Sequence, residues 1–228
     1  MDARIWRAEN SGPRVLLLHG FLGHPDDWAA TRKAFGAVGE WTAPFLPGHG
    51  ARPLPVELPS YAQHLAKLSG GIPFDYCIGY SLGGRLACAL QSMGAVWGKL
   101  ILVGARPIPE VALDRLARDM LQADTLMRVG LERFLESWYQ QPLFQGLQLT
   151  DAFLARRRLH QKAPLATILH KWSPARLRVA AHPAPETIIY GAQDPVRPTG
   201  CELIDNCSHH VPEMAPETLA LLLRARLL

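Results

Sequence analysis

The stretch Gly79-Tyr80-Ser81-Leu82-Gly83 decides the fold, because it has the Gly-x-Ser-x-Gly pattern of a sharp turn between a strand and a helix. The apolar run Asp75-Tyr76-Cys77-Ile78 precedes it, and a helix-like run over residues 85–90 follows it. In that context a serine hydroxyl is exposed at the end of a buried strand, and the flanking glycines allow the tight turn. Ser81 is therefore the candidate nucleophile, and a purely structural turn is the less favoured interpretation.

Short apolar runs alternate with longer helical patterns along the rest of the chain. Such alternation predicts a parallel sheet flanked by helices. Near-continuous apolar runs are typical of strands that are covered on both faces. The expected strands cover residues 14–19, 76–80, 100–103, 187–190 and the shorter 203–204. The expected fold class is therefore α/β, with a mostly parallel sheet.

The stretch over residues 106–172 differs from the rest because it has no strong strand signal. Helical patterns with mixed charge cover three parts of it, namely residues 108–127, 131–139 and 152–160. About 65 residues is long for a single crossover between two strands. We therefore predict an α/β core over residues 1–105 and 173–228 with an inserted helical lid over 106–172. Ordinary crossover helices are the alternative.

A serine nucleophile needs a base, and the base needs an acid that orients it. Asp194 directly follows one expected strand, and His209 comes shortly after another. The chain order Ser81, Asp194, His209 is the order typical of this kind of turn, and strand ends are where sites form in open α/β sheets. These three residues are the candidate catalytic triad, although an aspartate before Pro195 could also serve only to form a turn.

His209 competes with its neighbour His210 for the role of base, because adjacent residues cannot both face Ser81. In sites of this kind the histidine loop runs to a proline at a helix start seven positions later. Pro216 has that spacing from His209. We therefore prefer His209.

An oxyanion that forms during the reaction needs two backbone N–H donors aimed at it in advance. The first expected donor is the amide of Leu82, the residue after the nucleophile. The second is the amide of Phe21, in the loop His19-Gly20-Phe21-Leu22-Gly23 that follows an expected strand. A simple turn at His19-Gly20 is the alternative interpretation.

The composition excludes several classes of protein. Of the 228 residues 48% are hydrophobic and 19% are charged, so the chain is not a disordered one. The formal net charge of +4 is spread out, so no basic stripe predicts nucleic-acid binding. No apolar stretch approaches the ~20 residues of a membrane span, and no signal peptide is visible. We expect a cytoplasmic protein without membrane insertion, and the sequence indicates no particular oligomeric state.

None of the four cysteines belongs to a Cys-x-x-Cys pair; they are Cys77, Cys88, Cys201 and Cys207. The chain thus lacks a zinc or redox signature, and we expect buried free thiols in a reducing compartment. Cys207 lies close to the two adjacent histidines, but no second ligand cluster supports a metal site there. We therefore expect no metal.

Over nearly its whole length the chain resembles the α/β-hydrolase superfamily. The segment from His19-Gly20 to Trp28, the loop Leu46-Pro47-Gly48-His49-Gly50, the serine turn, Asp194 and His209 follow in family order. A closer resemblance is to the 2-succinyl-6-hydroxy-2,4-cyclohexadiene-1-carboxylate synthases of menaquinone biosynthesis. Two strings carry it, Gly79-Tyr80-Ser81-Leu82-Gly83-Gly84-Arg85 and Trp138-Tyr139-Gln140-Gln141-Pro142-Leu143-Phe144. The second string is far less common than the first.

The resemblance implies an elimination that needs no cofactor. The implied substrate is 2-succinyl-5-enolpyruvyl-6-hydroxy-3-cyclohexene-1-carboxylate, a small and multiply anionic molecule. Ser81, activated by His209 and Asp194, would abstract a ring proton, and pyruvate would leave. The oxyanion hole would stabilise charge on the succinyl carbonyl.

The family's substrate-binding residues also carry over to this chain. The matching positions are Tyr80, Arg85, Arg115, Trp138 and Arg157. Arg157 matches only with one gap, which leaves Arg156 or Arg158 as alternatives. The chemistry agrees with this set, since an anion with several carboxylates needs several guanidinium groups to hold it.

Two other functions compete with the synthase. A carboxylesterase or thioesterase would use the same triad, and faster turnover of short acyl esters than of the ring substrate would favour it. A binding protein on a hydrolase scaffold is the second competitor. Such proteins typically lose a triad member, whereas this chain keeps Ser81, Asp194 and His209.

Overall fold

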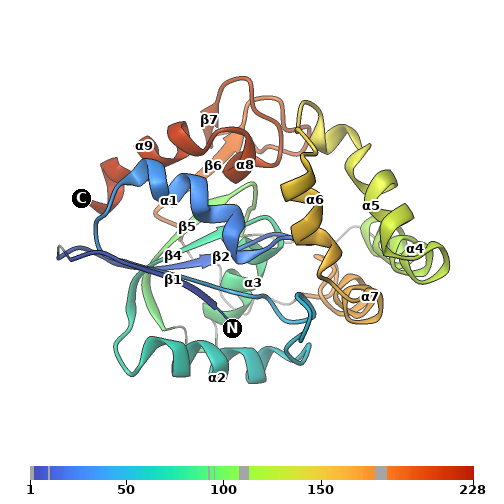
Figure 1. Cartoon of the computed structure of the whole chain (residues 1–228), viewed down its shortest axis with the longest axis horizontal. Helices are drawn as coiled ribbons and strands as arrows, with labels where there is room; N and C mark the ends of the chain where they lie inside the picture. Colours follow the sequence, from blue (N-terminus) through green and yellow to red (C-terminus); the bar gives the residue numbers. More distant parts are fainter. Residues whose placement is uncertain (1–2, 10, 92, 95, 108–112, 178–183) are drawn as a thin grey trace.

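A seven-stranded sheet forms the centre of the described part of the chain in the computed structural model (Figure 1). The structure describes residues 3–9, 11–91, 93–94, 96–107, 113–177 and 184–228. The strands are β1 (Ala3–Arg7), β2 (Arg14–Leu18), β3 (Glu40–Pro44), β4 (Phe74–Tyr80), β5 (Trp97–Val103), β6 (Thr187–Gly191) and β7 (Glu202–Ile204). Their order is β1-β3-β2-β4-β5-β6-β7, in which β1 is antiparallel to β3 and the other neighbours are parallel. The predicted α/β class is confirmed.

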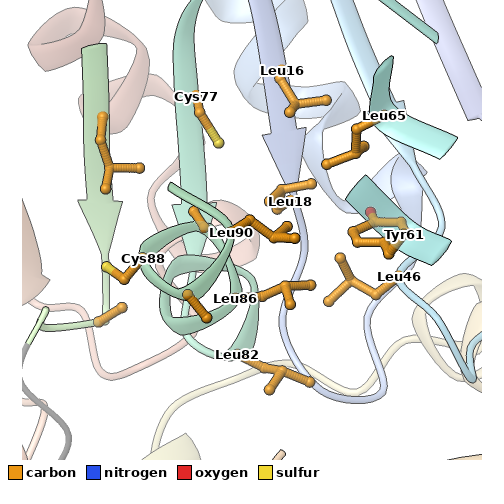
Figure 2. Close-up of a cluster of buried hydrophobic side chains, with 14 of the residues drawn as sticks. Leu16, Leu18, Leu46, Tyr61, Leu65, Cys77, Leu82, Leu86, Cys88 and Leu90 are labelled. Carbon is orange, nitrogen blue, oxygen red and sulfur yellow. The ribbon is translucent and has the colours of Figure 1, made fainter. Parts of the chain in front are cut away.

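Helices cover both faces of the sheet, because successive side chains of a strand point to opposite faces. Leu16 and Leu18 of β2 join one buried cluster, whereas Val15 and Leu17 join another. The first cluster includes side chains of α2 (Leu58–Ser69) and α3 (Leu82–Gln91), as Figure 2 shows. The second includes α9 (Pro216–Leu227) and Phe35 of α1 (Ala29–Phe35). The sheet is thus the middle layer of three, and the strands are buried on both sides.

In the described part of the stretch between β5 and β6, four further helices pack beside the layered core (Figure 1). They are α4 (Leu113–Val129), α5 (Leu131–Tyr139), α6 (Asp151–Arg158) and α7 (Lys162–Lys171), with the 3-10 turn η2 (Pro142–Phe144) after α5. Thr150 caps α6 by accepting a hydrogen bond from the Phe153 amide at 3.2 Å. This helical segment has its own buried cluster, which Leu22 from the core also enters. The division into core and lid stays a prediction.

The expected strands are all present, longer or shorter than expected by one to three residues. The helix expected over 131–139 has those bounds, whereas α4 begins at Leu113 and residues 108–112 lie outside the described ranges. The sequence interpretation missed β1, β3, α1, α2 and α7. A proline near the start hides α7, since Pro164 reads as a helix breaker but stands in the first turn, where its missing N–H has no helical partner to lose. The short elements η1 (Pro25–Trp28) and α8 (Val211–Met214) complete the described set.

Within the described ranges no helix is long and apolar enough to cross a membrane. The four cysteines are free. In the part of the chain that the structure describes, no group of three or more His, Cys, Asp or Glu side chains is arranged to hold a metal ion.

Candidate active site

Ser81 stands in the sharp turn between β4 and α3. Its backbone is left-handed, with a φ of +49°, a conformation that a residue other than glycine rarely adopts. The neighbouring glycines make the turn fit. A Cβ atom at Gly79 would lie 2.5 Å from a backbone carbon of α3, and one at Gly83 would lie 2.3 Å from the carbonyl oxygen of Leu18. The Gly-x-Ser-x-Gly pattern thus reflects close backbone contacts that leave no room for side chains at either glycine.

The three candidate triad residues form one hydrogen-bonded chain. His209 Nε2 lies 2.9 Å from Ser81 Oγ, and His209 Nδ1 lies 2.6 Å from Asp194 Oδ2. Asp194 is fully buried, and its other oxygen accepts a hydrogen bond from the Val196 amide at 2.9 Å. A carboxylate can only accept, so the imidazole carries its proton on Nδ1 and leaves Nε2 free to take the serine proton. The geometry suits general-base activation of Ser81.

His210 borders the same cavity as Ser81, but its ring contacts other residues. Its ring packs against Tyr80, with 5.0 Å between ring centroids, and its Nε2 accepts a hydrogen bond from Arg157 at 3.2 Å. Burial, assisted by the charge of Arg157, lowers the pKa of His210 to about 3. The neighbour His209 is held by its own amide, which donates to the Leu143 carbonyl of η2 at 3.2 Å. The structure therefore brings His209, and not His210, to Ser81.

A cavity of about 460 Å³ lies at the carboxyl ends of the strands, under the helical segment. Its lining includes most of the predicted site residues, namely Phe21, Tyr80, Ser81, Leu82, Arg85, Arg115, Trp138 and His209. Asp194 is not part of the lining, because it lies behind His209. Phe21 and Leu82, the two expected oxyanion donors, thus border the same space as the serine.

The described residues of the cavity lining carry an excess of positive charge. Four arginines and two aspartates belong to this described lining, and we call them the cavity cluster: Arg85, Arg106, Arg115, Arg118, Asp114 and Asp119. Burial first, and the neighbouring Arg115 second, lower the pKa of Arg85 to about 10. Within the described residues no hydrogen-bond partner reaches the buried Arg85 Nε. The net charge of two positive units, four minus two, suits a ligand that brings negative charge.

Asp119 orients one of these cations. Arg115 Nε lies 2.9 Å and 3.1 Å from the two carboxylate oxygens of Asp119, one helical turn further along α4. Asp119 is buried, whereas the Arg115 side chain is partly exposed. Sequence reasoning missed four charged residues of the cavity cluster, namely Asp119, Arg118, Arg106 and Asp114. The four-residue spacing from Arg115 to Asp119 was a signal that could have found the first of them.

Trp138, on α5 of the helical segment, packs against Phe21 in the loop over residues 19–23, which we call the oxyanion loop. Its ring centroid is 5.0 Å from that of Phe21 and 5.5 Å from that of Phe134. Its buried Nε1 has no hydrogen-bond partner among the described residues, although the side chain borders the cavity. An indole N–H of this kind can donate to an oxygen atom of a ligand.

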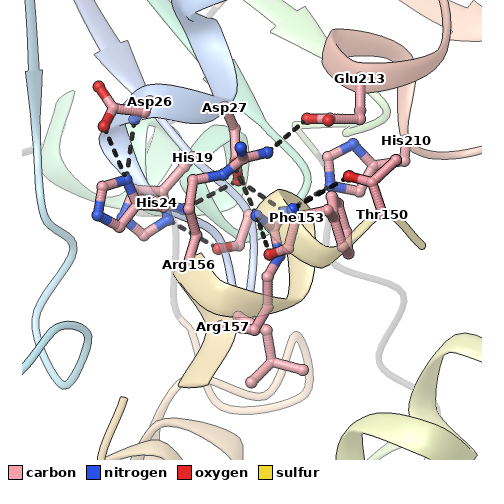
Figure 3. Close-up of polar contacts among 12 residues, drawn as sticks. His19, His24, Asp26, Asp27, Thr150, Phe153, Arg156, Arg157, His210 and Glu213 are labelled. Carbon is pink, nitrogen blue, oxygen red and sulfur yellow. Dashed lines mark hydrogen bonds and ion pairs between the residues drawn. The ribbon is translucent and has the colours of Figure 1, made fainter. Parts of the chain in front are cut away.

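The Arg157 side chain, which was predicted to contact the substrate, is fully buried and does not border the cavity. Its Nη1 and Nη2 atoms lie 2.7 Å and 2.9 Å from the two oxygens of Asp27, as Figure 3 shows. The guanidinium also stacks on Phe153 at 3.5 Å. Burial alone raises the pKa of Asp27, but Arg157 outweighs it and holds the pKa well below its usual range. The spacing of 130 residues between the two partners gave no sequence signal.

The two alternatives to Arg157 do not line the cavity either. Arg156 bonds to Asp27 at 3.0 Å and to Glu213 at 2.9 Å. Arg158 points outward and pairs with Glu132 at 3.0 Å. We call Arg156, Arg157, Asp27 and Glu213 the α6 cluster; its charges are balanced, two against two.

Comparison with known proteins agrees with this architecture. A family model described as "Alpha/beta hydrolase family" matches residues 15–227. Two relatives named 2-succinyl-6-hydroxy-2,4-cyclohexadiene-1-carboxylate synthase are similar to this chain. The one from Enterobacter sp. (strain 638) is 34% identical over 80% of this chain and 76% of its own length. The one from Klebsiella pneumoniae (strain 342) is 33% identical over 77% and 73%.

Solved structures share the fold. One described as MenH from S. aureus has a TM-score of 0.80 and 23% identity, over 98% of this chain and 97% of its own. A thermophilic esterase from Thermogutta terrifontis, with malate bound, has a TM-score of 0.75 and 19% identity, over 98% and 91%. Both likenesses concern the architecture, since their identities are low.

Proposed function

The chain belongs to the alpha/beta hydrolase family, and from this premise we propose that it eliminates pyruvate from 2-succinyl-5-enolpyruvyl-6-hydroxy-3-cyclohexene-1-carboxylate. Its product would be 2-succinyl-6-hydroxy-2,4-cyclohexadiene-1-carboxylate, the compound named in its relatives at 33–34% identity. The observation that carries the proposal is the arginine-rich cavity directly beside Ser81. A substrate with several carboxylates matches that excess of positive charge. The pathway would be menaquinone biosynthesis.

The proposed reaction is a proton abstraction followed by loss of a leaving group. His209 Nε2 takes the hydroxyl proton of Ser81 while Ser81 Oγ takes a proton from a ring carbon of the substrate. The C–H electron pair forms a ring double bond between C2 and C3, and the pair of the existing C3–C4 double bond moves to C4–C5. The C5–O bond then breaks with its pair on the enolpyruvyl oxygen. The proton on His209 passes to this leaving group, which becomes pyruvate. No acyl-enzyme forms, and no cofactor takes part.

The rest of the site would stabilise the charge that moves during this step. Negative charge builds on the succinyl carbonyl, and the amides of Phe21 and Leu82 are the proposed donors to it. Arg85 and Arg115 would hold carboxylates of the substrate, and Trp138 Nε1 would donate to one of its oxygens. The helical segment then acts as a lid, since its residues close one side of the cavity.

Pyruvate release tests the proposal directly. The purified protein is incubated with the enolpyruvyl substrate, and pyruvate is measured with lactate dehydrogenase and NADH. We expect turnover by the parent and its loss, by a factor of about a thousand or more, in Ser81→Ala. His209→Ala should lose a similar factor, and the double variant little more, because the two residues act as a unit. Ser137→Ala, an exposed serine on α5, is the matched control and should keep full activity.

An ester hydrolase with the same triad is the competing function. The parent and Ser81→Ala are assayed in parallel on short p-nitrophenyl esters. Serine-dependent ester hydrolysis that exceeds pyruvate release would support that alternative and overturn the proposed elimination. If Ser81→Ala releases pyruvate at the same rate as the parent, then Ser81 takes no part in the reaction.

A further inference from the structure

Three buried histidines outside the triad lie ring against ring behind the oxyanion loop. His19 follows β2, His49 follows β3, and His160 lies between α6 and α7 in the helical segment. The ring centroids of His19 and His49 are 5.0 Å apart, and those of His49 and His160 are 5.2 Å apart. None of the three lines the cavity. The mechanism proposed above does not use them.

Each of these rings is satisfied by one backbone N–H and one backbone carbonyl. The His19 ring accepts from the Leu46 N–H at 3.1 Å and donates to the Gly20 carbonyl at 2.9 Å. The His49 ring accepts from the Leu22 N–H at 3.1 Å and donates to the Pro47 carbonyl at 3.0 Å. The His160 ring accepts from the Gly50 N–H at 2.8 Å and donates to the Leu22 carbonyl at 3.1 Å. A backbone N–H can only donate and a carbonyl can only accept. All three rings are therefore neutral, each in a fixed tautomer. The proton is on Nδ1 of His19 and His49, and on Nε2 of His160.

Two of these rings form hydrogen bonds with the backbone of Leu22. His49 accepts from its N–H, and His160 donates to its carbonyl. Leu22 has a φ of +60°, a left-handed conformation that its side chain disfavours. Its N–H belongs to the peptide that joins it to Phe21, whose amide is the expected oxyanion donor. The two histidines thus fix a strained backbone directly beside that donor.

We propose that His160 is a positioning residue for the oxyanion hole, because it ties the Leu22 carbonyl, and through it the Phe21 amide, to the helical segment. This inference rests on the proposed function of Ser81 and deepens it. The hole is complete only while the segment between α6 and α7 is seated on the core. Substrate contacts to the helical segment then favour the same arrangement that the chemistry needs.

Two substitutions of His160 separate positioning from simple support of the fold. In His160→Asn the amide oxygen overlies Nδ1, so the bond from the Gly50 amide is kept and the bond to Leu22 is lost. In His160→Gln the amide nitrogen overlies Nε2, so the bond to the Leu22 carbonyl is kept and the other is lost. Each variant loses one hydrogen bond to the core. A structural role predicts equal effects, whereas positioning predicts that only the asparagine variant harms the hole.

The test uses phenylboronic acid as a probe of the hole. Ser81 Oγ forms a bond to boron, its proton passes to His209, and one oxygen of the tetrahedral adduct occupies the oxyanion position. Dissociation constants are measured by calorimetry at pH 7, with thermal unfolding of each variant alongside. We expect binding about tenfold weaker for His160→Asn, the value of one positioning hydrogen bond, and within about twofold of the parent for His160→Gln. His170→Gln, at the end of α7, is the control and should bind like the parent.

Kinetics give a second measurement. In His160→Asn the kcat for pyruvate release should fall about tenfold, while KM stays near the parental value because Arg85 and Arg115 are untouched. Equal boronate affinities of the two His160 variants, or a weaker one for the glutamine variant, would overturn the inference. If the folded parent fails to bind the boronate, the assignment of Ser81 and this inference fall together. If the parent binds the boronate but releases no pyruvate, the proposed reaction alone is wrong, and the comparison of variants still decides the role of His160.

Discussion

The cavity cluster and the α6 cluster are both rich in arginine, yet they differ in charge balance. Among the residues that the structure describes, four arginines and two aspartates line the cavity. Two arginines face Asp27 and Glu213 beside α6, where Arg157 is fully buried. The first cluster has two positive charges in excess, and the second has none.

This difference separates binding from folding. A buried guanidinium that already has a carboxylate on both arms offers nothing to a substrate, however well its position in the sequence matches. A guanidinium such as Arg85, whose pKa is lowered to about 10 by burial and by a neighbouring cation, gains from any anion that enters. The charge balance around an arginine, rather than its presence, therefore decides its role.

The largest expected effect is a loss of stability when the charge balance of the α6 cluster is disturbed. Arg157→Ala leaves Asp27 buried without its main partner, so the free energy of unfolding should fall by about 3–5 kcal/mol. Equilibrium unfolding in urea measures this loss. The double variant Asp27→Asn with Arg157→Met removes both charges and should recover much of it. If Arg157→Ala changes the free energy of unfolding only slightly and raises KM, then Arg157 contacts the substrate after all.

The second effect is on catalysis and concerns the cavity cluster. Arg115→Ala should lower kcat/KM for pyruvate release by tens-fold, roughly 2 kcal/mol, because a fixed cation near the substrate is lost. Arg115→Lys keeps the charge without the planar fork and should not restore full activity. Unfolding in urea is measured alongside, because Arg115→Ala also leaves the buried carboxylate of Asp119 without this partner.

A neutral substrate is the control for that prediction. If the parent hydrolyses a small neutral ester, Arg115→Ala should hydrolyse it about as well. Equal losses on the anionic and the neutral substrate would mean that Arg115 supports the helical segment and does not bind substrate. The two clusters would then share one structural role.

Acid should weaken the fold through buried histidines, including the one in contact with the α6 cluster. Burial is the main cause that lowers the pKa of His210 and His19 to about 3 and of His160 to about 4, against about 6.5 in an unfolded chain. Between pH 6.5 and about 4 the unfolded chain therefore binds protons that the folded one does not. The free energy of unfolding should fall as the pH falls through this window, by up to about 1.4 kcal/mol per pH unit for each histidine.

Unfolding in urea at several pH values between 7 and 4.5 measures this slope. His210→Gln removes one titrating group and should make the slope shallower than in the parent. Asp27 acts in the same direction but at lower pH, because its lowered pKa stabilises the fold above about pH 4 and this effect is lost only below that pH. A parental slope in His210→Gln would show that His210 does not stay neutral in the fold.

Local patterns placed the candidate triad at strand ends that the structure brings together, because this part of the geometry is encoded over short distances. The turn around Ser81 needs its two glycines within five residues, and the triad members follow strand ends that apolar runs reveal. Substrate-binding residues on the helical segment were harder to predict. The partner of Arg157 is Asp27, which the fold brings close from 130 residues away. Family position alone could not distinguish an arginine that faces the cavity from one held by a buried carboxylate.

The smallest expected effect comes from Arg158, the next residue along α6. Arg158 Nε lies 3.1 Å and 3.0 Å from the two oxygens of Glu132, so it has about as many carboxylate contacts as Arg157. Its side chain is 46% exposed and that of Glu132 is 62% exposed, so water screens the pair in the folded chain as it does in the unfolded chain. Arg158→Ala should therefore change the free energy of unfolding by less than about 0.5 kcal/mol and leave pyruvate release unchanged. If urea unfolding instead shows a loss as large as in Arg157→Ala, then the number of hydrogen bonds, and not burial, governs the arginines of α6.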